Sequence, residues 1–274
     1  PMTAHPKIDP ENGEMLFFGY NANGTISEHM TFSVVDRDGK LLRSESFEAP
    51  YASMVHDFVV TRDHVIFPIM PLTGSLERAF KGGPLYAWEP EKGSHIGIMP
   101  RNGTVKDLKW FRGEASYVFH PMNAFAGDDG KIVCDVCEYP EAPLFPGVDG
   151  QPGDPKKALA KLVRWTFDLN AQTDSYRVEQ LDELVCEFPR LDERRAGLSY
   201  RFGYFAGDTQ PPEKVGGFNV IAAIDHQTGK LSSYDVGEGC ATSEPIFVPR
   251  SASCEEGDGF LLACLLYTSD AADD

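Results

Sequence analysis

The sequence is built from short apolar runs that alternate with turn-forming residues over almost its whole length. Examples are MTFSVVD, HVIFPIM, ASYVFH and GFNVIAAID, which are rich in β-branched and aromatic residues. Runs of about four to eight residues with this composition favour β-strands, whereas helices need about ten residues or more. The pattern therefore predicts an all-β protein.

Several neighbouring runs are joined by hairpin-type turns. Asp38-Gly39 lies between VVD and KLLRSESF, and Thr228-Gly229 separates AAID from KLSSYDV. These residues suit a tight hairpin because glycine adopts the positive φ that such turns require. Antiparallel pairs repeated along a chain are typical of a β-propeller or a large sandwich.

Three segments depart from the strand pattern. Residues 153–165 (GDPKKALAKLVRW) favour a helix that turns into a strand at Leu162. Residues 139–155 are rich in Pro and Gly, and they predict a long loop within one domain rather than a linker between two. We expect one domain over residues 1–264. Residues 265–274 are expected to be a non-native tail, because no turn chemistry follows the last apolar run.

Composition excludes some classes of function. The chain has 42 acidic and 25 basic residues and a formal charge of −17, whereas nucleic-acid binding relies on Lys and Arg. Six cysteines in 274 residues are too few for a disulfide scaffold and favour free thiols in the cytoplasm. The single C-x-x-C motif, CDVC, lacks a second pair, so we do not expect zinc there. No apolar run approaches the ~18 residues of a membrane-spanning helix.

Three of the seven histidines share a context. His5, His56 and His120 each stand at the edge of a strand-like run, separated by about fifty and about sixty residues. That spacing excludes a zinc finger but suits ligands from separate blades of a propeller, whose inner strands converge on the axis. Core histidines that each bond a backbone carbonyl are the alternative. The remaining histidines (His29, His64, His95 and His226) are predicted to lie at the surface or at strand edges.

Two glutamates are candidates to support such histidines. Glu187 lies in LVCEFPRLD and Glu244 in SEPIFVP, both beside apolar residues. A buried carboxylate needs a partner, and a ligating histidine needs an acceptor for its second ring N–H. The alternative for each glutamate is an edge-strand acid that points into water.

Taken together, these motifs resemble the carotenoid cleavage oxygenase family, which includes lignostilbene dioxygenases and the retinoid isomerase of vision. The matching elements are TAHPKIDP, MVHDFVVT, YVFHPMNAF, CEFPRLD and SEPIFVP, in the order of the family. The segment GGPLYAWEPEKGSHIGIMPR is most similar to the bacterial lignostilbene-cleaving branch. The resemblance runs from Pro1 to about Ala263.

The resemblance implies a seven-bladed β-propeller with a non-haem Fe(II) on its axis. His5, His56 and His120 correspond to three of the four histidine ligands of the family, and Glu187 and Glu244 to glutamates that support the ligands. The implied reaction cleaves a C=C bond of a stilbenoid or apocarotenoid with O2 and gives two carbonyl products. The implied partners are therefore a small hydrophobic alkene and O2, with membrane contact and oligomeric state left open. Isomerisation at the same iron site, or a non-catalytic binding propeller, are the alternatives.

Some family features have no counterpart in the sequence. The fourth histidine ligand, expected in a His-Gly context near the C-terminus, and a supporting glutamate before His5 are both missing. Family members often carry an acid after NAF, where Ala126 stands here. We therefore expect a fragment that lacks several blades, is inactive alone and tends to aggregate through unpaired strand edges.

Overall fold

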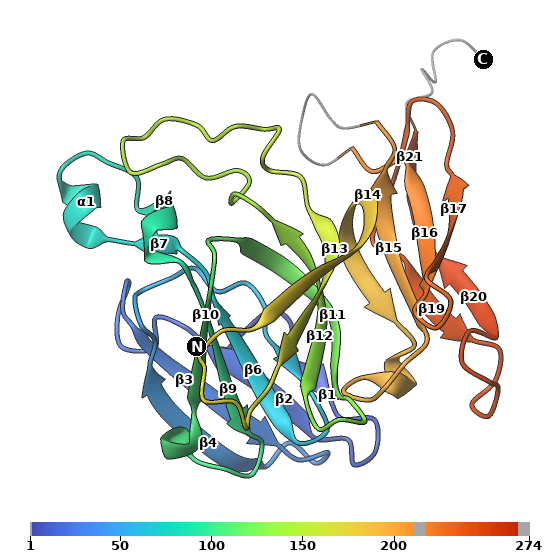
Figure 1. Cartoon of the computed structure of the whole chain (residues 1–274), viewed down its shortest axis with the longest axis horizontal. Coiled ribbons are helices and arrows are strands. Elements are labelled where there is room, and N and C mark those ends of the chain that lie inside the picture. The colour runs from blue at the N-terminus through green and yellow to red at the C-terminus, as the bar shows by residue number, and fades with distance from the viewer. Residues whose placement is uncertain (1, 211–216, 268–274) are drawn as a thin grey trace.

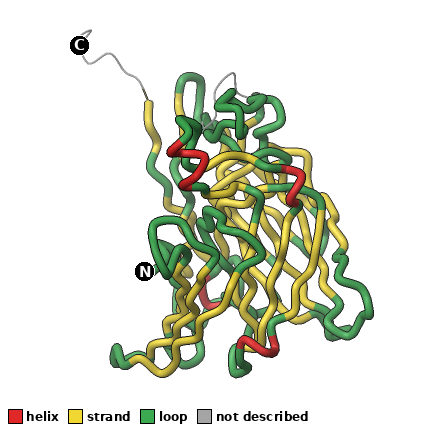
Figure 2. The backbone as a smooth tube through the Cα atoms, turned by 90° about the vertical axis from the view of Figure 1, so that its left-hand side faces the viewer, coloured by secondary structure: helices red, strands yellow, loops and turns green. Residues whose placement is uncertain are grey.

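The computed structural model describes residues 2–210 and 217–267. Strands dominate the backbone, as Figure 2 shows, which confirms the all-β prediction. The single α-helix of the described residues is α1 (Leu76–Phe80). Three short 3-10 turns accompany it: η1 (Pro90–Lys92), η2 (Val105–Asp107) and η3 (Glu193–Arg195). Within the described ranges, no helix has the length and apolar character needed to cross a bilayer.

The first sheet is an antiparallel meander in the order β1-β2-β3-β4. Its strands are β1 (Lys7–Ile8), β2 (Met15–Gly19), β3 (His29–Val35) and β4 (Leu41–Glu48). The predicted hairpin joins β3 to β4, with Gly39 at a φ of 84°. Leu16 and Phe18 of β2 and Phe32 of β3 are fully buried.

The second sheet has the order β10-β9-β6-β5. Its strands are β5 (Val59–Val60), β6 (His64–Ile69), β9 (Ser94–Pro100) and β10 (Lys109–Gly113). The segment between β6 and β9 forms a separate pair, β7 (Leu72–Gly74) and β8 (Tyr86–Trp88), with α1 between them. The side chains of β6 are largely buried, so this strand lies inside the core.

The third sheet contains seven strands, β11 to β17 in sequence order. They are β11 (Tyr117–Ala126), β12 (Ile132–Tyr139), β13 (Lys161–Phe167), β14 (Arg177–Leu191), β15 (Phe202–Asp208), β16 (Val220–Asp225) and β17 (Lys230–Asp235). The first part of β14 pairs mainly with β13 and the second part with β15. The sheet is therefore two four-stranded units that share one long strand. The second predicted hairpin joins β16 to β17, where Gly229 has a φ of 68°.

Two short pairs follow at the C-terminal side. They are β18 (Cys240–Thr242) with β21 (Leu265–Tyr267), and β19 (Ile246–Pro249) with β20 (Gly259–Leu262). The first three residues of the expected tail, 265–267, thus form a strand. Residues 268–274 lie outside the described part.

From β5 onward, the first strands of successive four-stranded units contact one another. β11 contacts β5 on one side and β14 on the other, and β14 contacts β19. Figure 1 shows the sheets following one another in chain order, from blue to red. Two clusters of buried side chains fill the space between them, one centred on the first two sheets and one on the second and third. Successive four-stranded meanders with adjoining first strands are the blades of a β-propeller.

The structure corrects two predictions. Residues 153–165 contain no helix, because Pro155–Lys157 form a turn and β13 begins at Lys161. His226 is not a surface residue, because its side chain is 6% exposed and its ring packs against Tyr200. The loop at 139–155 joins β12 to β13 within one sheet, as predicted.

Candidate metal centre

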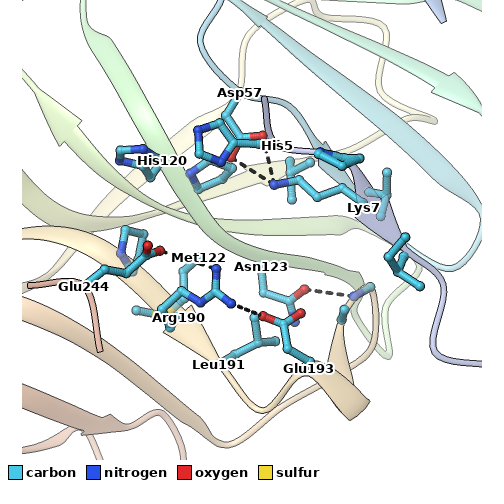
Figure 3. A pocket seen from close by; sticks show the side chains of 18 residues that line it. His5, Lys7, Asp57, His120, Met122, Asn123, Arg190, Leu191, Glu193 and Glu244 are labelled. Atoms are coloured by element: carbon cyan, nitrogen blue, oxygen red, sulfur yellow. Dashed lines mark hydrogen bonds and ion pairs between the residues drawn. The ribbon is translucent and has the colours of Figure 1, made fainter. Parts of the chain in front are cut away.

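His5, His56 and His120 meet in space although they are far apart in the sequence. The Nε2 atoms of His5 and His56 are 3.1 Å apart, and those of His56 and His120 are 3.2 Å apart. One ring nitrogen from each histidine lies within 4.8 Å of the other two. Figure 3 shows the rings of His5 and His120 at the end of a pocket. The three imidazoles therefore converge on one point.

Each histidine lies at or near the first strand of a different sheet. His5 precedes β1, His56 precedes β5, and His120 is part of β11. β5 contacts β11, and the Lys7–Asp57 ion pair joins the segments of His5 and His56, so the three rings can face a common centre. The pairing of β11 with β12 is irregular on both sides of Pro121, which is the position next to His120. Such β-bulges commonly redirect a side chain near a functional site.

The spacing of the three nitrogens suits a metal ion. Two imidazoles bound at about 2.0–2.1 Å, with an angle of about 90–109° at the metal, have nitrogens about 2.9–3.4 Å apart. The observed separations of 3.1 and 3.2 Å fall in this range. Mutual N–H···N hydrogen bonds would need a similar distance, but three rings that share one centre cannot all donate and accept in turn with good angles. The donor set therefore fits a divalent cation.

Glu187 fixes the orientation of His120. The Nδ1 atom of His120 donates to Oε2 of Glu187 at 2.7 Å, and the Glu187 side chain is 4% exposed. The backbone N–H of Phe188 donates to the same oxygen, and the Tyr139 hydroxyl donates to Oε1 at 3.1 Å. The bond to Nδ1 leaves Nε2 as the atom directed at the other two histidines.

A buried ion pair joins the segments that carry His5 and His56. The Lys7 ammonium lies 2.9 Å from the Asp57 carboxylate, whose side chain is 4% exposed. Asp57 also accepts a hydrogen bond from the backbone N–H of Phe58 at 2.7 Å. The pair connects two histidine-bearing segments without requiring a metal, so it helps to pre-form the site.

The electrostatic environment of the three histidine rings suits the binding of a cation. Burial, together with the neighbouring imidazoles, lowers the pKa of His56 to about 4, and burial also lowers the pKa of His5. Burial disfavours the charged form of His120 too, but its hydrogen bond with Glu187 and the charge of that carboxylate outweigh this and raise its pKa. Two rings are thus neutral near pH 7, as metal binding requires, and Glu187 favours positive charge at the third, whether it comes from a proton or a metal.

Glu244 lies in the same pocket but bonds differently from Glu187. Its carboxylate is 43% exposed and lies 3.3 Å from the Arg190 guanidinium. The pocket has a volume of about 210 Å³ and is lined by His5, His120 and Glu244, among others. Figure 3 shows Glu244 and Arg190 across the pocket from the histidines. Among the described residues, no histidine is hydrogen-bonded to Glu244.

Sequence reasoning missed Lys7, Asp57, Tyr139 and Arg190. Asp57 directly follows His56, and Lys7 lies two residues after His5, so a search for charges beside candidate ligands would have found both. Tyr139 and Arg190 carry no comparable local signal. The pairing of β12 with β11, and the bulge in β14, bring them to the site.

Fold and site together define a β-propeller with a candidate metal centre where its first strands meet. The family described as retinal pigment epithelial membrane protein (RPE65) matches residues 1–273. The chain belongs to this family, and its fold is the seven-bladed β-propeller of that family, of which the described sheets form a part.

Curated relatives cover nearly all of the chain. It is 42% identical over 269 residues to the isoeugenol monooxygenase of Pseudomonas putida, and 36% identical over 277 residues to the lignostilbene-alpha,beta-dioxygenase isozyme III of Sphingomonas paucimobilis. Each alignment covers 95% of this chain and 56% of the relative. The chain thus spans about half the length of the curated relatives it matches.

Solved structures of similar proteins support the same family and fold. The lignostilbene dioxygenase of Pseudomonas brassicacearum superposes with a TM-score of 0.90 at 38% identity, covering 96% of this chain and 57% of that one. A cobalt-substituted form of Synechocystis ACO superposes with a TM-score of 0.80 at 27% identity, covering 97% of this chain and 56% of that one. The resemblance predicted from the motifs is confirmed.

Proposed function

We propose that the protein containing this chain is an iron-dependent dioxygenase that cleaves the C=C bond of a small aromatic alkene. The observation that carries the proposal is the convergence of three Nε2 atoms with a carboxylate behind one of them. The relatives named for isoeugenol and lignostilbene support an aromatic alkene as the substrate class.

His5, His56 and His120 would hold the metal through Nε2, and Glu187 would orient His120. An all-imidazole set suits Fe(II), which would supply the redox chemistry that activates O2. The neutral rings leave the ion's charge uncompensated, and the buried Glu187 offsets part of it. A fourth ligand is expected from outside this chain, and Glu244 is proposed as a supporting acid.

Both aromatic and charged side chains surround the histidine cluster. The Phe119 ring contacts the ring of His56 edge-on, with centroids 5.3 Å apart, and packs in the same way against Tyr139. Lys7, Asp57 and Arg190 line the pocket together with apolar residues such as Met122 and Leu191. We place the alkene beside Phe119 and Tyr139, whose apolar surface would exclude water and hold the double bond.

The proposed reaction needs no reductant. The C=C bond and the O–O bond break, each former alkene carbon gains one oxygen, and two carbonyl compounds result. No proton is consumed or released, so no general acid or base is required. The chain's residues bind, orient and keep the site dry.

Isotope labelling tests the proposal. The protein is expressed from a clone that carries this chain within its complete reading frame, and the iron of the purified protein is quantified. The protein is then incubated with isoeugenol or a stilbene under ¹⁸O2, and the carbonyl products are trapped rapidly. We expect about one iron per chain and ¹⁸O in both products. Recovery of an isomer of intact length would favour an isomerase, and a metal-free protein that still binds the alkene would favour a binding propeller.

Variants connect the activity to the site. His120→Ala should lose iron and activity, and Glu187→Gln should weaken iron binding by about 10- to 100-fold. His29→Ala is the matched control, because the His29 side chain is 44% exposed and lies away from the cluster. Equal iron loss in His29→Ala and His120→Ala would refute the assignment.

A further inference from the structure

We propose that Tyr139 is a positioning residue, whose hydroxyl holds the Glu187 carboxylate in the orientation that aligns His120. The inference rests on the proposed metal site but concerns a residue outside the expected ligand set. Tyr139 ends β12 and lies opposite Tyr117 of β11. It is 5% exposed, so its hydroxyl has little access to bulk water.

The hydrogen bonds of Glu187 show why the carboxylate needs Tyr139. Oε2 accepts from His120 Nδ1 and from the backbone N–H of Phe188, whereas Oε1 accepts from the Tyr139 hydroxyl. Among the described residues, Tyr139 is the one hydrogen-bond partner of Oε1. A buried carboxylate oxygen without a donor is unfavourable, so loss of this hydroxyl would let the carboxylate rotate away from His120.

Packing keeps the hydroxyl in place. The Tyr139 ring meets Phe119 edge-on, with centroids 5.8 Å apart, and Phe119 meets His56 in the same way. Burial, and next the charge of Glu187, raise the pKa of Tyr139, so the phenol keeps its proton and donates. Tyr139→Phe would retain the ring and its contacts and remove this donor alone.

Tyr200 provides a matched control within the chain. It is also buried, at 7% exposed, and its hydroxyl donates to the buried carboxylate of Asp135 at 2.6 Å. That carboxylate pairs with Arg164 and contacts none of the three histidines. Tyr200→Phe therefore removes the same kind of hydrogen bond from another part of the core.

The first measurement uses the protein expressed from the complete reading frame. Its affinity for Co(II), the probe metal, is determined by competition with a chelator. We expect Tyr139→Phe to bind Co(II) about tenfold more weakly with an altered visible spectrum, and Tyr200→Phe to bind as the wild type does. With the alkene as substrate, Tyr139→Phe should lower kcat, whereas KM should stay within about twofold of the wild-type value. Unchanged Co(II) affinity in Tyr139→Phe, or equal weakening in both variants, would overturn the proposal.

The second measurement needs no metal. In the metal-free protein, the His120 Nδ1–H proton should give a protected, downfield NMR signal, which Tyr139→Phe should broaden and Tyr200→Phe should leave unchanged. If the wild type binds no metal, the proposed function fails, and this signal alone decides the role of Tyr139. A signal that persists unchanged in Tyr139→Phe rules the positioning role out.

Discussion

Glu138 shows at the scale of a single residue how burial sets the charge state of the core. It precedes Tyr139 on β12, is partly buried, and accepts a hydrogen bond from the Trp165 ring N–H. Burial raises the pKa of this carboxyl to about 7, although the bond from Trp165 opposes the shift. The acid is therefore substantially protonated in the folded protein at neutral pH, whereas it is ionised in the unfolded chain.

This difference predicts a pH-dependent stability. Between about pH 4.5 and about pH 7 the folded state binds more protons at Glu138 than the unfolded state does, so its contribution to stability falls as pH rises and levels off above pH 7. The loss would amount to about 3 kcal/mol, since one pKa unit corresponds to about 1.4 kcal/mol. Urea unfolding of the wild type and of Glu138→Gln, which keeps an acceptor for Trp165, provides the measurement. The free energy of unfolding of the wild type, relative to that of Glu138→Gln, should fall as pH rises from about 4.5 to about 7. A relative free energy of unfolding that does not change with pH would contradict the prediction.

Among the elements, β14 has an irregular position that both strains the backbone and directs the Glu187 carboxylate at His120. Its pairing with β15 shifts register between Glu187 and Arg190, and Phe188 between them has a φ of 53°. This conformation is unfavourable for a residue with a Cβ, by about 1–2 kcal/mol. The Phe188 ring lies against His120, with centroids 5.4 Å apart. The bulge thus places strain next to the carboxylate that it directs at His120.

Two substitutions separate strain from packing at this bulge. Phe188→Ala and Phe188→Gly both remove the ring, but glycine adopts the positive φ without strain. Phe188→Gly should therefore be more stable than Phe188→Ala by about 1 kcal/mol, the reverse of the usual order in a strand. Thermal and urea unfolding of the two variants would measure this. A more stable alanine variant would show that the position is not strained.

At the scale of the whole molecule, the described sheets leave an apolar surface uncovered. Ile246 pairs with Leu262 and Val248 with Phe260 across β19 and β20, and all four side chains are exposed. We call these four residues the hairpin face. Contiguous apolar surface of this kind commonly packs against another unit, and in a propeller the neighbouring unit is a blade.

The hairpin face predicts the behaviour of the 274-residue chain in solution. We expect concentration-dependent association, because the face and the nearby strand edges can pair between copies. Phe260→Lys with Leu262→Lys should reduce light scattering, whereas Val178→Lys, at an exposed valine on β14, should not. A wild-type chain that stays monomeric at about 100 µM would contradict this prediction.

The strand-rich architecture, the three histidines and Glu187 could be predicted from the amino-acid sequence alone. Alternating apolar runs and Gly-containing turns are local signals, and His5, His56, His120 and Glu187 stand in motifs that can be recognised in order. Local signals failed at residues 153–165, where the strand register of β13 prevailed over helix propensity, and at His226, which the fold buries.

The contacts between these side chains could not be predicted from the sequence, because they form only in the folded chain. The Lys7–Asp57 pair, the Tyr139–Glu187–His120 chain and the contact of Glu244 with Arg190 join residues that are roughly fifty or more positions apart. Such contacts depend on strand register, bulges and the meeting of sheets. These are collective properties of the packed chain, and no short segment encodes them.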